Sequence, residues 1–256
     1  MNTVQVHNWR NTAKERFTYE EFMAAQLEMV RNRLNGTREH DAIILTTHPP
    51  TITLGRRSLK EQLSHIRVFS QTILESQLPD DELLRRARAY LQESCDIDLI
   101  KTNRGGSVWY HDHGVLQIYL IFQVPPFMMS GIIYPLEEAL LRTLNGLNIK
   151  TERAPESIRK EDKSFLGLWV KERKIAALGM RIQSNGTNYV SMFGASLNVT
   201  PDMSGCEMID PCGIPDRHMT SIAEEYGYAK GMEIPLIPCL LVHLAHTFNI
   251  HIAPAT

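Results

Sequence analysis

Apolar residues recur at intervals of three and four along the segment that follows Thr18. Thr18 and Glu21 form the pattern of a capping box, in which two side chains and two backbone amides satisfy each other at a helix start. The run ends at Asn35-Gly36, a pair that favours the end of a helix. We therefore predict an amphipathic helix between these signals. Its apolar face is expected to contain Met23, Leu27, Val30 and Leu34.

The rest of the chain changes between short β-type runs and helical runs, separated by turn residues. In chain order we expect strands over 41–47 and 51–54, a helix over 79–93, strands over 97–102 and 115–122, a helix that Pro135 opens, strands over 166–171, 174–182 and 187–199, an irregular stretch over 200–217, and two closing helical pieces, after Thr220 and over 238–248. Hairpin signals without a regular strand–helix–strand alternation indicate an α+β domain. We expect a single domain over residues 1–256, with an insertion at about 56–95.

Charge and hydropathy exclude several broad classes of function. The chain has 27 basic and 29 acidic side chains, so its net charge of −2 provides no overall positive field for nucleic acid or an anionic membrane. The first ten residues are polar and do not resemble a secretory signal. The longest apolar stretch, over 234–244, contains two prolines and is too short to span a bilayer. We therefore expect a cytoplasmic protein that binds neither nucleic acid nor a membrane.

Four cysteines, at positions 95, 206, 212 and 239, lack the close spacing of a metal site, and no metal is expected. In a reducing compartment they should be free thiols, and a free cysteine is most often a small buried apolar residue. Cys212 differs because it lies in the run Asp210-Pro211-Cys212-Gly213-Ile214-Pro215, whose prolines and glycine predict a loop that displays the thiol. A neighbouring cation would lower the thiol pKa from about 8.5 and increase the reactive fraction.

Two further stretches combine polar side chains with an unusual setting. The run from Arg104 to His111 lies between two predicted strands and contains Gly105-Gly106, a pair that lets a backbone approach a ligand closely. The alternative is a hairpin loop that uses glycine for its positive φ angles. Lys174 begins an otherwise apolar strand, where a lysine either extends its ammonium group to water or assists a neighbouring reactive group. The residues alone do not decide between a ligand-binding loop and a simple hairpin at 104–111, or between a solvated and a functional lysine at position 174.

Taken in order, these stretches resemble the lipoyl(octanoyl) transferases, which move an octanoyl group from acyl carrier protein to a lysine of a lipoyl domain. The matching stretches are His48-Pro49-Pro50 with Thr53-Leu54-Gly55, Arg104-Gly105-Gly106 through Tyr110-His111, Lys174-Ile175-Ala176, Leu197-Asn198-Val199, and Pro211-Cys212-Gly213 followed by Thr220-Ser221-Ile222. They cover most of residues 41–222. The resemblance implies an α+β fold with the mixed sheet of biotin and lipoate protein ligase catalytic domains.

The resemblance also implies a two-step transfer with Cys212 and Lys174 as catalytic residues. The Cys212 thiolate would attack the octanoyl thioester, and the acceptor lysine would then attack the acyl-cysteine, while Lys174 lowers the thiol pKa and shuttles a proton. Thioester exchange needs no ATP, so no cofactor is expected. The implied acceptors are lipoyl domains of 2-oxoacid dehydrogenase E2 subunits or the glycine cleavage H protein. The basic residues Arg56, Arg57 and Lys60 either contact the acidic carrier or form an ordinary solvated turn.

The resemblance places the acyl chain against three stretches. The implied substrate-binding residues are Arg104, Gly105, Gly106, Ser107, Val108, Trp109, Tyr110, His111, Ala177, Leu178, Gly179, Phe193, Gly194, Ala195 and Ser196. Backbone amides near Gly179 and Gly194 would stabilise the tetrahedral oxyanion. Each buried methylene would contribute up to about 0.8 kcal/mol to the binding free energy, so the protein could discriminate between acyl chains of different length.

The chain departs from the family pattern at several of these positions. Asp112-His113-Gly114-Val115 stands where the family usually has a Gly-Pro-Gly-Gln-like run, Phe193 stands in place of a histidine, and Trp109 replaces a smaller residue. The segment 56–95 is longer than usual. Because two bulky rings would reshape the acyl pocket, we hypothesise an altered acyl preference or weakened activity with the same transfer chemistry.

Two other functions fit the same scaffold. A lipoate or biotin ligase would activate a free acid with ATP and would not need the Cys212 nucleophile. A non-catalytic protein would only hold an acylated carrier or a lipoyl domain. The presence of both Cys212 and Lys174 favours the transferase over either alternative.

Overall fold

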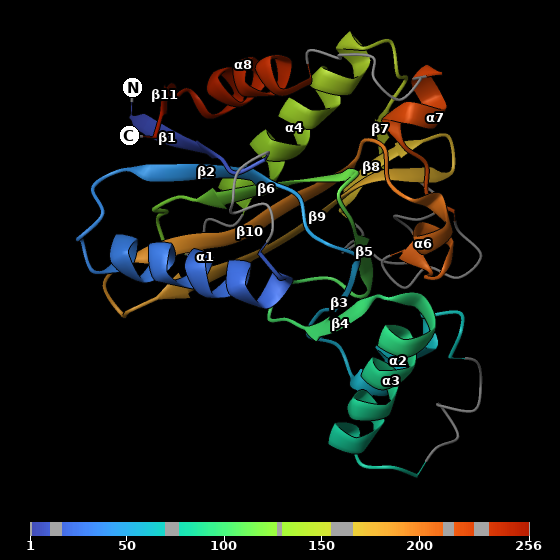
Figure 1. Cartoon of the computed structure of the whole chain (residues 1–256). Helices are drawn as coiled ribbons and strands as arrows, with labels where there is room; N and C mark the ends of the chain where they lie inside the picture. Colours follow the sequence, from blue (N-terminus) through green and yellow to red (C-terminus); the bar gives the residue numbers. More distant parts are fainter. Residues whose placement is uncertain are drawn as a thin grey trace.

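Two sheets of unequal size form the framework of the protein (Figure 1). The structure is a computed structural model that describes residues 2–10, 17–69, 77–126, 130–154, 166–211, 218–227 and 236–255. The large sheet has the strand order β11-β1-β2-β6-β10-β9-β8-β7, and the small sheet has the order β4-β3-β5. In the large sheet, β1 runs parallel to both β2 and β11, and the other neighbouring strands pair antiparallel. The sheet is therefore mixed, and the predicted α+β class is confirmed.

The elements have the following bounds. The strands are β1 (Thr3–Asn8), β2 (Asp41–Thr46), β3 (Thr51–Leu54), β4 (Asp98–Lys101), β5 (Trp109–His111), β6 (Val115–Ile121), β7 (Glu152–Arg153), β8 (Gly167–Val170), β9 (Arg173–Ser184), β10 (Tyr189–Asn198) and β11 (His251–Pro254). The helices are α1 (Tyr19–Leu34), α2 (Leu59–Ser64), α3 (Asp80–Cys95), α4 (Ser130–Gly146), α6 (Met203–Glu207), α7 (Ile222–Tyr226) and α8 (Leu236–Phe248).

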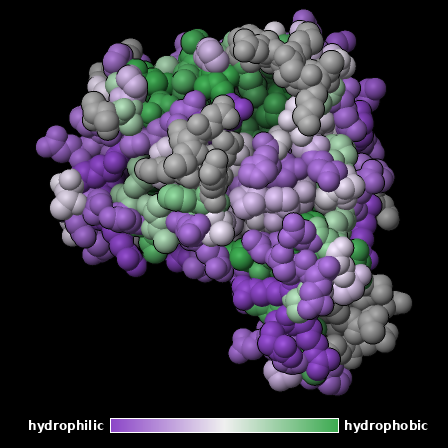
Figure 2. Space-filling view, in the orientation of Figure 1, coloured by the Kyte–Doolittle hydropathy of each residue, from purple (hydrophilic) through white to green (hydrophobic). Residues whose placement is uncertain are grey.

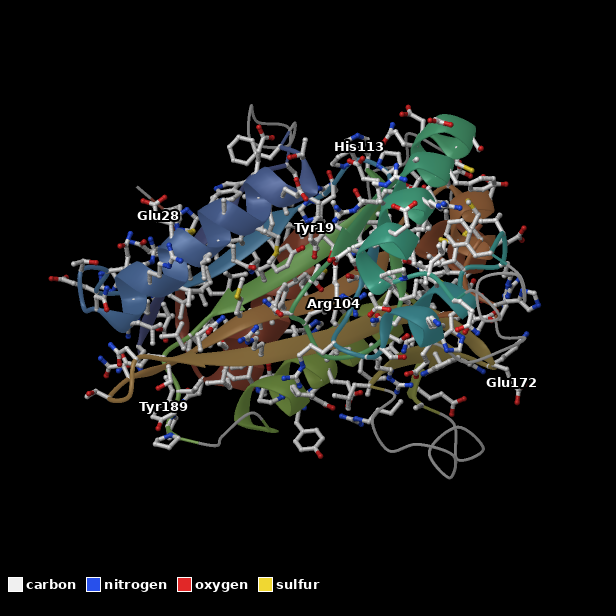
Figure 3. All side chains as sticks on the ribbon, turned by 90° about the horizontal axis from the view of Figure 1, so that it is seen from below. Tyr19, Glu28, Arg104, His113, Glu172 and Tyr189 are labelled. Carbon is white, nitrogen blue, oxygen red and sulfur yellow. The ribbon has the colours of Figure 1, made fainter. Side chains whose placement is uncertain are left out.

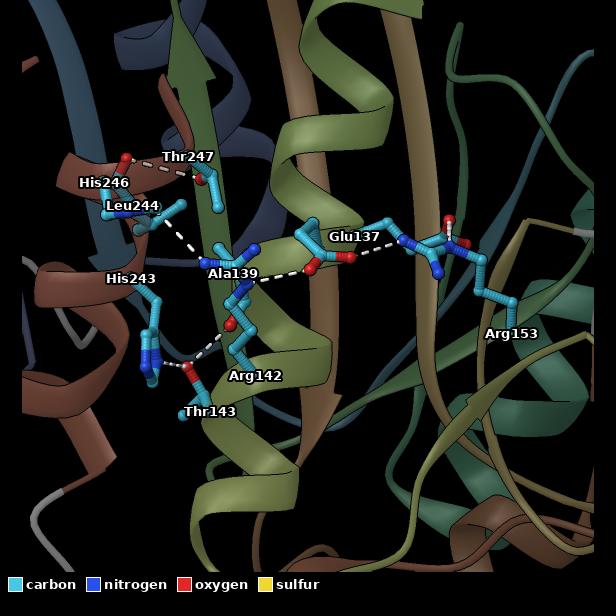
Figure 4. Close-up of polar contacts among 10 residues, drawn as sticks. Glu137, Ala139, Arg142, Thr143, Arg153, His243, Leu244, His246 and Thr247 are labelled. Atoms are coloured by element: carbon cyan, nitrogen blue, oxygen red, sulfur yellow. Dashed lines mark hydrogen bonds and ion pairs between the residues drawn. The ribbon is translucent and has the colours of Figure 1, made fainter. Parts of the chain in front are cut away.

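Helices cover both faces of the large sheet. On one face α4 and α8 bury leucines, among them Leu136 and Leu240, against the sheet residues Ile43 and Ile118. A hydrogen bond of 3.0 Å between Thr143 Oγ1 and His243 Nδ1 joins the two helices (Figure 4). On the other face α1 packs against β6 and β10. This second face carries the cavity described below.

A separate apolar core lies between the small sheet, α2, α3 and α6. Its buried residues include Leu63 of α2, Leu91 of α3, Ile52 of β3 and Ile209 after α6. The segment 56–95 therefore buries its apolar side against the small sheet, and the lobe around α2 and α3 shows a largely hydrophilic surface (Figure 2).

The predicted start of α1 is confirmed in detail, because Thr18 Oγ1 accepts a hydrogen bond from the Glu21 N–H at 3.2 Å and Glu21 Oε2 accepts from the Thr18 N–H at 2.8 Å. The apolar face is rotated from the prediction. Its buried residues are Tyr19, Phe22, Gln26, Val30 and Leu34, and the predicted Met23 and Leu27 are only partly buried.

Other predicted boundaries were wrong. Pro135 lies inside α4, which begins at Ser130, because Ile132 and Ile133 extend its buried face at the cost of one backbone hydrogen bond. The stretch 200–217, predicted to be irregular, contains α6. The run Arg104–His111, predicted as a loop, contains β5, which pairs with β3. The strands β1 and β11 and the helix α2 were not predicted. None of the helices in the described ranges has the length and apolar character needed to cross a bilayer.

Candidate active site

Small side chains on β9 and β10, beside Gln117 and Tyr119 of β6, form the floor of a cavity. The ladders β6–β10 and β10–β9 align Tyr119, Gly194 and Gly179 in one row. They align Gln117, Ser196 and Ala177 in the next row, where Ser196 Oγ donates to Gln117 Oε1 at 2.6 Å. Because side chains two positions apart share a face, both rows face the α1 side of the sheet. Two glycines and an alanine leave open space there.

The roof of the cavity comes from the small sheet and from α1. Tyr19, Trp109, His111 and the loop Arg104–Gly106 close over the floor. A Cβ atom at Gly179 would lie 3.2 Å from the Gly105 carbonyl oxygen, so the loop lies close above the strand. Tyr19 and Arg104 both lie near the centre of the molecule in Figure 3. The cavity has a volume of about 40 Å³, which is room for roughly three water molecules.

A buried polar network supports the roof from behind. The Arg104 guanidinium donates at 2.8 Å to both the backbone oxygen and Oγ1 of Thr53. Thr53 Oγ1 also lies 3.0 Å from His111 Nε2, and His48 Nε2 lies 2.8 Å from the Tyr119 hydroxyl. Burial, with a further contribution from His113, lowers the pKa of His48 to about 3. Burial also lowers the pKa of His111 well below its ordinary value, so both imidazoles are neutral at physiological pH.

Lys174 is fully buried on the far side of Trp109 from this cavity and does not itself line the wall. Its Nζ donates to the Leu166 carbonyl oxygen at 3.1 Å and lies 5.2 Å from the Trp169 ring centroid and 6.0 Å from the Trp109 ring centroid. Trp109 also lines the cavity, so this indole separates the cavity from the ammonium group. Contacts with two aromatic rings stabilise a buried cation.

A β-bulge turns the lysine toward the cavity. The β8–β9 register shifts between Leu168 and Trp169, so β9 carries one extra residue there. Ile175 and Ala176 consequently both point into the core beneath α4 and α8, and Lys174 emerges on the opposite face. Without the extra residue, strict alternation would direct the lysine into the apolar core.

The backbone of Lys174 is hydrogen-bonded to residues that follow Cys212, the proposed nucleophile, by six and eight positions. Its N–H donates to the His218 carbonyl oxygen at 3.0 Å, and its carbonyl oxygen accepts from the Thr220 N–H at 3.0 Å. Cys212 itself lies in 212–217, outside the described residues. Before that segment, Ile209 forms an antiparallel bridge with Ile66.

The two flanks of 212–217 meet at a second cavity of about 160 Å³. Arg67, which contacts the residues before the segment, and His218, which follows it, both line this cavity. Arg173, which precedes Lys174 in β9, lines the same cavity, so both flanks lie close to the start of β9.

The unusual run after His111 forms the turn between β5 and β6. Asp112 Oδ1 accepts from the Gly114 N–H at 2.7 Å, and its Oδ2 accepts from the Asp202 N–H at 2.6 Å. The Gly114 carbonyl oxygen accepts from the N–H groups of Val199 and Thr200 at 3.0 and 2.9 Å. A Cβ atom at position 114 would lie 2.0 Å from the Thr200 oxygen, so only glycine fits. These residues hold the start of α6 against the sheet.

The structure gathers most of the predicted binding residues around the first cavity. Those on its wall are Arg104, Gly105, Gly106, Trp109, His111, Ala177, Leu178, Gly179, Phe193, Gly194, Ala195 and Ser196. Ser107, Val108 and Tyr110 are buried but are not on the wall, and Val108 and Tyr110 pack in the core of the lobe.

Three wall residues were missed by the sequence analysis. Gln117 and Tyr119 stand two apart in an apolar strand, a spacing that indicates one special face, whereas nothing local marks Tyr19. Within the described ranges, no three His, Cys, Asp or Glu side chains come together as a metal site would need.

Comparison with known proteins adds independent observations. A family model described as the lipoyl protein ligase A/B catalytic domain matches residues 18–236. An octanoyltransferase of Chloroflexus aggregans is 34% identical over 211 residues, which cover 81% of this chain and 80% of the relative. An octanoyltransferase of Dictyoglomus turgidum is 32% identical over 222 residues, which cover 86% and 79% of the two chains.

Solved structures share the fold at low sequence identity. A lipoate-protein ligase A bound with ATP aligns with a TM-score of 0.65 at 12% identity and covers 100% of this chain and 88% of the other. A bipartite lipoate protein ligase of Thermoplasma acidophilum, described with its E2 lipoyl domain, aligns with a TM-score of 0.58 at 11% identity and covers 100% and 86%. At these identities the likeness concerns the fold alone.

Proposed function

Since this chain belongs to the lipoyl protein ligase A/B catalytic domain family and is an enzyme of octanoyl transfer in protein lipoylation, we propose that it works through an acyl-cysteine at Cys212. The donor is an octanoyl thioester of acyl carrier protein, and the acceptor is a lipoyl-domain lysine.

The setting of Lys174 carries this proposal. Its side chain is buried behind Trp109, a wall residue of the cavity, and its backbone is hydrogen-bonded to His218 and Thr220. These two residues closely follow the segment that contains Cys212. One lysine thus joins the cavity proposed for the acyl chain to the chain segment proposed to supply the nucleophile.

The chemistry balances in two steps without ATP. In the first step the Cys212 sulfur forms a bond to the thioester carbon, the carbon–sulfur bond to the carrier breaks, and the carrier thiolate takes up a proton. In the second step the acceptor amine forms an amide bond to the same carbon, the carbon–sulfur bond to Cys212 breaks, and the Cys212 thiolate takes up the amine proton. The Lys174 ammonium favours the Cys212 thiolate and supplies a route for both protons.

The acyl chain would lie in the cavity between the two rows of the sheet and the loop Arg104–Gly106. Gly179 keeps this space open, because a side chain there would approach the loop, whereas a side chain at Gly194 would collide with the backbone of β6. The volume of about 40 Å³ is small for eight carbons, so the roof must move when an octanoyl chain enters. Trp109 and Phe193 are the bulky wall residues that would have to move to admit the acyl chain.

The proposed donor and acceptor proteins are those that the resemblance to the octanoyltransferases implies. The acidic carrier would approach the lobe near Arg56, Arg57 and Lys60, although Arg57 also pairs with Glu61 at 2.9 Å. The acceptors would be E2 lipoyl domains or the glycine cleavage H protein, and the reaction would take place in the cytoplasm. A solved structure of the same fold is described with an E2 lipoyl domain, which supports this class of acceptor.

Intact-protein mass after incubation with octanoyl-carrier protein, without ATP, tests the route. We expect one octanoyl adduct that hydroxylamine removes, that persists in Cys95→Ser and that is absent in Cys212→Ser. Cys95 is the matched control because its side chain is exposed. An adduct retained in Cys212→Ser would refute the acyl-cysteine.

The same assay separates the two rival functions. Lipoyl-domain modification that requires ATP and free octanoate would identify a ligase. Stable carrier binding with no adduct and no modified acceptor would identify a binding protein. Lys174→Met should fold, because methionine suits the aromatic surroundings, but its acylation rate should fall by at least about 100-fold.

A further inference from the structure

We propose that Arg67 and Asp210 are positioning residues through which the segment 56–95 holds the chain just before Cys212 in place. This inference rests on the function proposed above. It gives the long segment between β3 and β4 a role in the transfer reaction, whereas the sequence leaves that role open.

The first observation is a backbone connection between the lobe and the residues after α6. The Arg67 N–H donates to the Met208 carbonyl oxygen at 2.7 Å, and the Asp210 N–H donates to the His65 carbonyl oxygen at 2.8 Å. Between these bonds, Ile66 and Ile209 form an antiparallel bridge, and both side chains are fully buried. The residues directly after α2 are thus paired like a short strand with the residues that lead to Cys212.

Side chains complete the connection at Asp210. Arg67 Nε lies 3.0 Å from Asp210 Oδ1, and His65 Nδ1 lies 3.9 Å from Asp210 Oδ2. The Asp210 side chain is only 16% exposed, which limits screening of the Arg67 charge by water. Asp210 precedes Cys212 by two residues, so this ion pair fixes the carboxylate nearest to the proposed nucleophile in the sequence.

The second observation links the same helix to the acyl cavity. Gln62 of α2 is fully buried, and its side chain bonds both the N–H and the carbonyl oxygen of Gly55. Gly55 in turn lies against the loop that roofs the cavity, because a Cβ atom there would lie 2.1 Å from the Gly106 oxygen. The short segment 62–67, which is the end of α2 and the three residues after it, therefore contacts both the cavity roof and the approach to Cys212.

This arrangement fixes the separation between the acyl cavity and the chain that leads to Cys212. The acyl chain must enter the cavity while its carbonyl carbon meets the Cys212 sulfur, so the two parts need a fixed separation. A displacement of about 1 Å in such a geometry can lower a rate by about 100-fold. Loss of the Arg67–Asp210 pair should therefore slow acylation far more than it weakens the fold, because partly exposed ion pairs contribute little to stability.

The experiment measures single-turnover acylation of the full chain by octanoyl-carrier protein, together with the KM for the carrier and the melting temperature. The variants are Arg67→Ala, Arg67→Lys, Asp210→Ala and the exchange Arg67→Asp with Asp210→Arg. Arg85→Ala is the matched control, because it removes an arginine that pairs with Glu82 at 2.8 Å elsewhere in the same segment.

We expect Arg67→Ala and Asp210→Ala to lower the acylation rate by about 10- to 100-fold, with KM and melting temperature close to those of the wild type. Arg67→Lys and the exchanged pair should recover most of the rate. Three results would overturn the proposal: Arg67→Ala behaving like Arg85→Ala, a change in KM alone, or an exchanged pair as slow as the single variants. If the wild type forms no adduct on Cys212, the proposed function itself fails before any variant is compared.

Discussion

Gly167 shows how closely one backbone position controls the buried lysine. Its φ of +148° is a conformation that residues with a side chain rarely adopt. A Cβ atom there would lie 2.4 Å from the Ala176 oxygen and 2.6 Å from Lys174 Cε. The glycine therefore provides the space through which the lysine side chain passes.

Replacing Gly167 with alanine should reduce both stability and transfer. We expect a loss of about 1–3 kcal/mol in the free energy of unfolding from backbone strain, and a lower acylation rate because Lys174 is displaced. Gly186→Ala is the control, since Gly186 has a φ of +94° but no neighbouring atom within 4 Å of the methyl group that alanine would add. Urea unfolding and single-turnover acylation measure both effects. Equal rates in the two variants would contradict the assigned role of Gly167.

For single residues, the sequence shows which side chains are unusual but does not show how they are oriented. Lys174 stands out in the sequence because a lysine is unusual at the start of an apolar strand, and the structure buries it beside the cavity. The β-bulge that turns it there depends on pairing with β8, which no local pattern contains. Tyr19 reaches the cavity only because α1 crosses the sheet, so tertiary packing alone identifies it.

Among the elements, β10 departs most clearly from a regular strand at the cavity. Phe193 has a φ of +73°, and a Cβ atom at Gly194 would lie 2.0 Å from the Ile118 oxygen. The strand is therefore locally distorted where it forms the cavity wall. The distortion places the Phe193 ring, which is 3% exposed, in the core between α1 and the sheet.

Phe193→Gly should widen the cavity and relieve the left-handed strain. Since each buried methylene contributes about 0.8 kcal/mol, we expect the acylation rate with a decanoyl donor, relative to octanoyl, to rise roughly tenfold. Phe122→Ala is the control, because it removes a buried phenylalanine from the opposite face of the sheet. The prediction fails if the decanoyl-to-octanoyl ratio in Phe193→Gly stays at the wild-type value.

The elements that the sequence predicted are those with strong local signals. The capping box at Thr18 and the hairpin residues after Ser184 act over four residues or fewer, so their effects can be derived from the chain alone. The helices α2 and α6 are too short to show a helical period, and they form because their leucines and cysteine are buried in the lobe. The length of α4 likewise reflects burial of Ile132 and Ile133 more than the signal of Pro135.

For the whole molecule, buried neutral histidines connect stability to pH. The pKa of His48 falls from 6.5 to about 3 on folding, because its imidazole is buried. Between these values the unfolded chain binds a proton that the folded chain does not bind. The stability that His48 contributes is therefore complete above pH 6.5 and is lost as the pH falls toward 3.

His48→Gln should make the protein less sensitive to acid. Glutamine keeps a polar group beside the Tyr119 hydroxyl but does not titrate. Below about pH 6.5 the free energy of unfolding of the wild type should fall faster than that of the variant, by about 1.4 kcal/mol per pH unit. Urea unfolding at intervals from about pH 4.5 to 8 measures the difference, which should be constant above about pH 7. Parallel curves over the acidic range would show that His48 is not the responsible group.

The position of β1 in the large sheet also has a consequence for the time course of folding. β1 lies between β2 and β11, and its register pairs Thr3 with His251, from opposite ends of the described chain (Figure 1). Closing so long a loop costs more chain entropy than forming the β9–β10 hairpin, and pairings between distant residues form slowly. The outer edge of β1 therefore stays open until β11 arrives. During that interval another chain could add to this edge, so dilute conditions should favour refolding over aggregation.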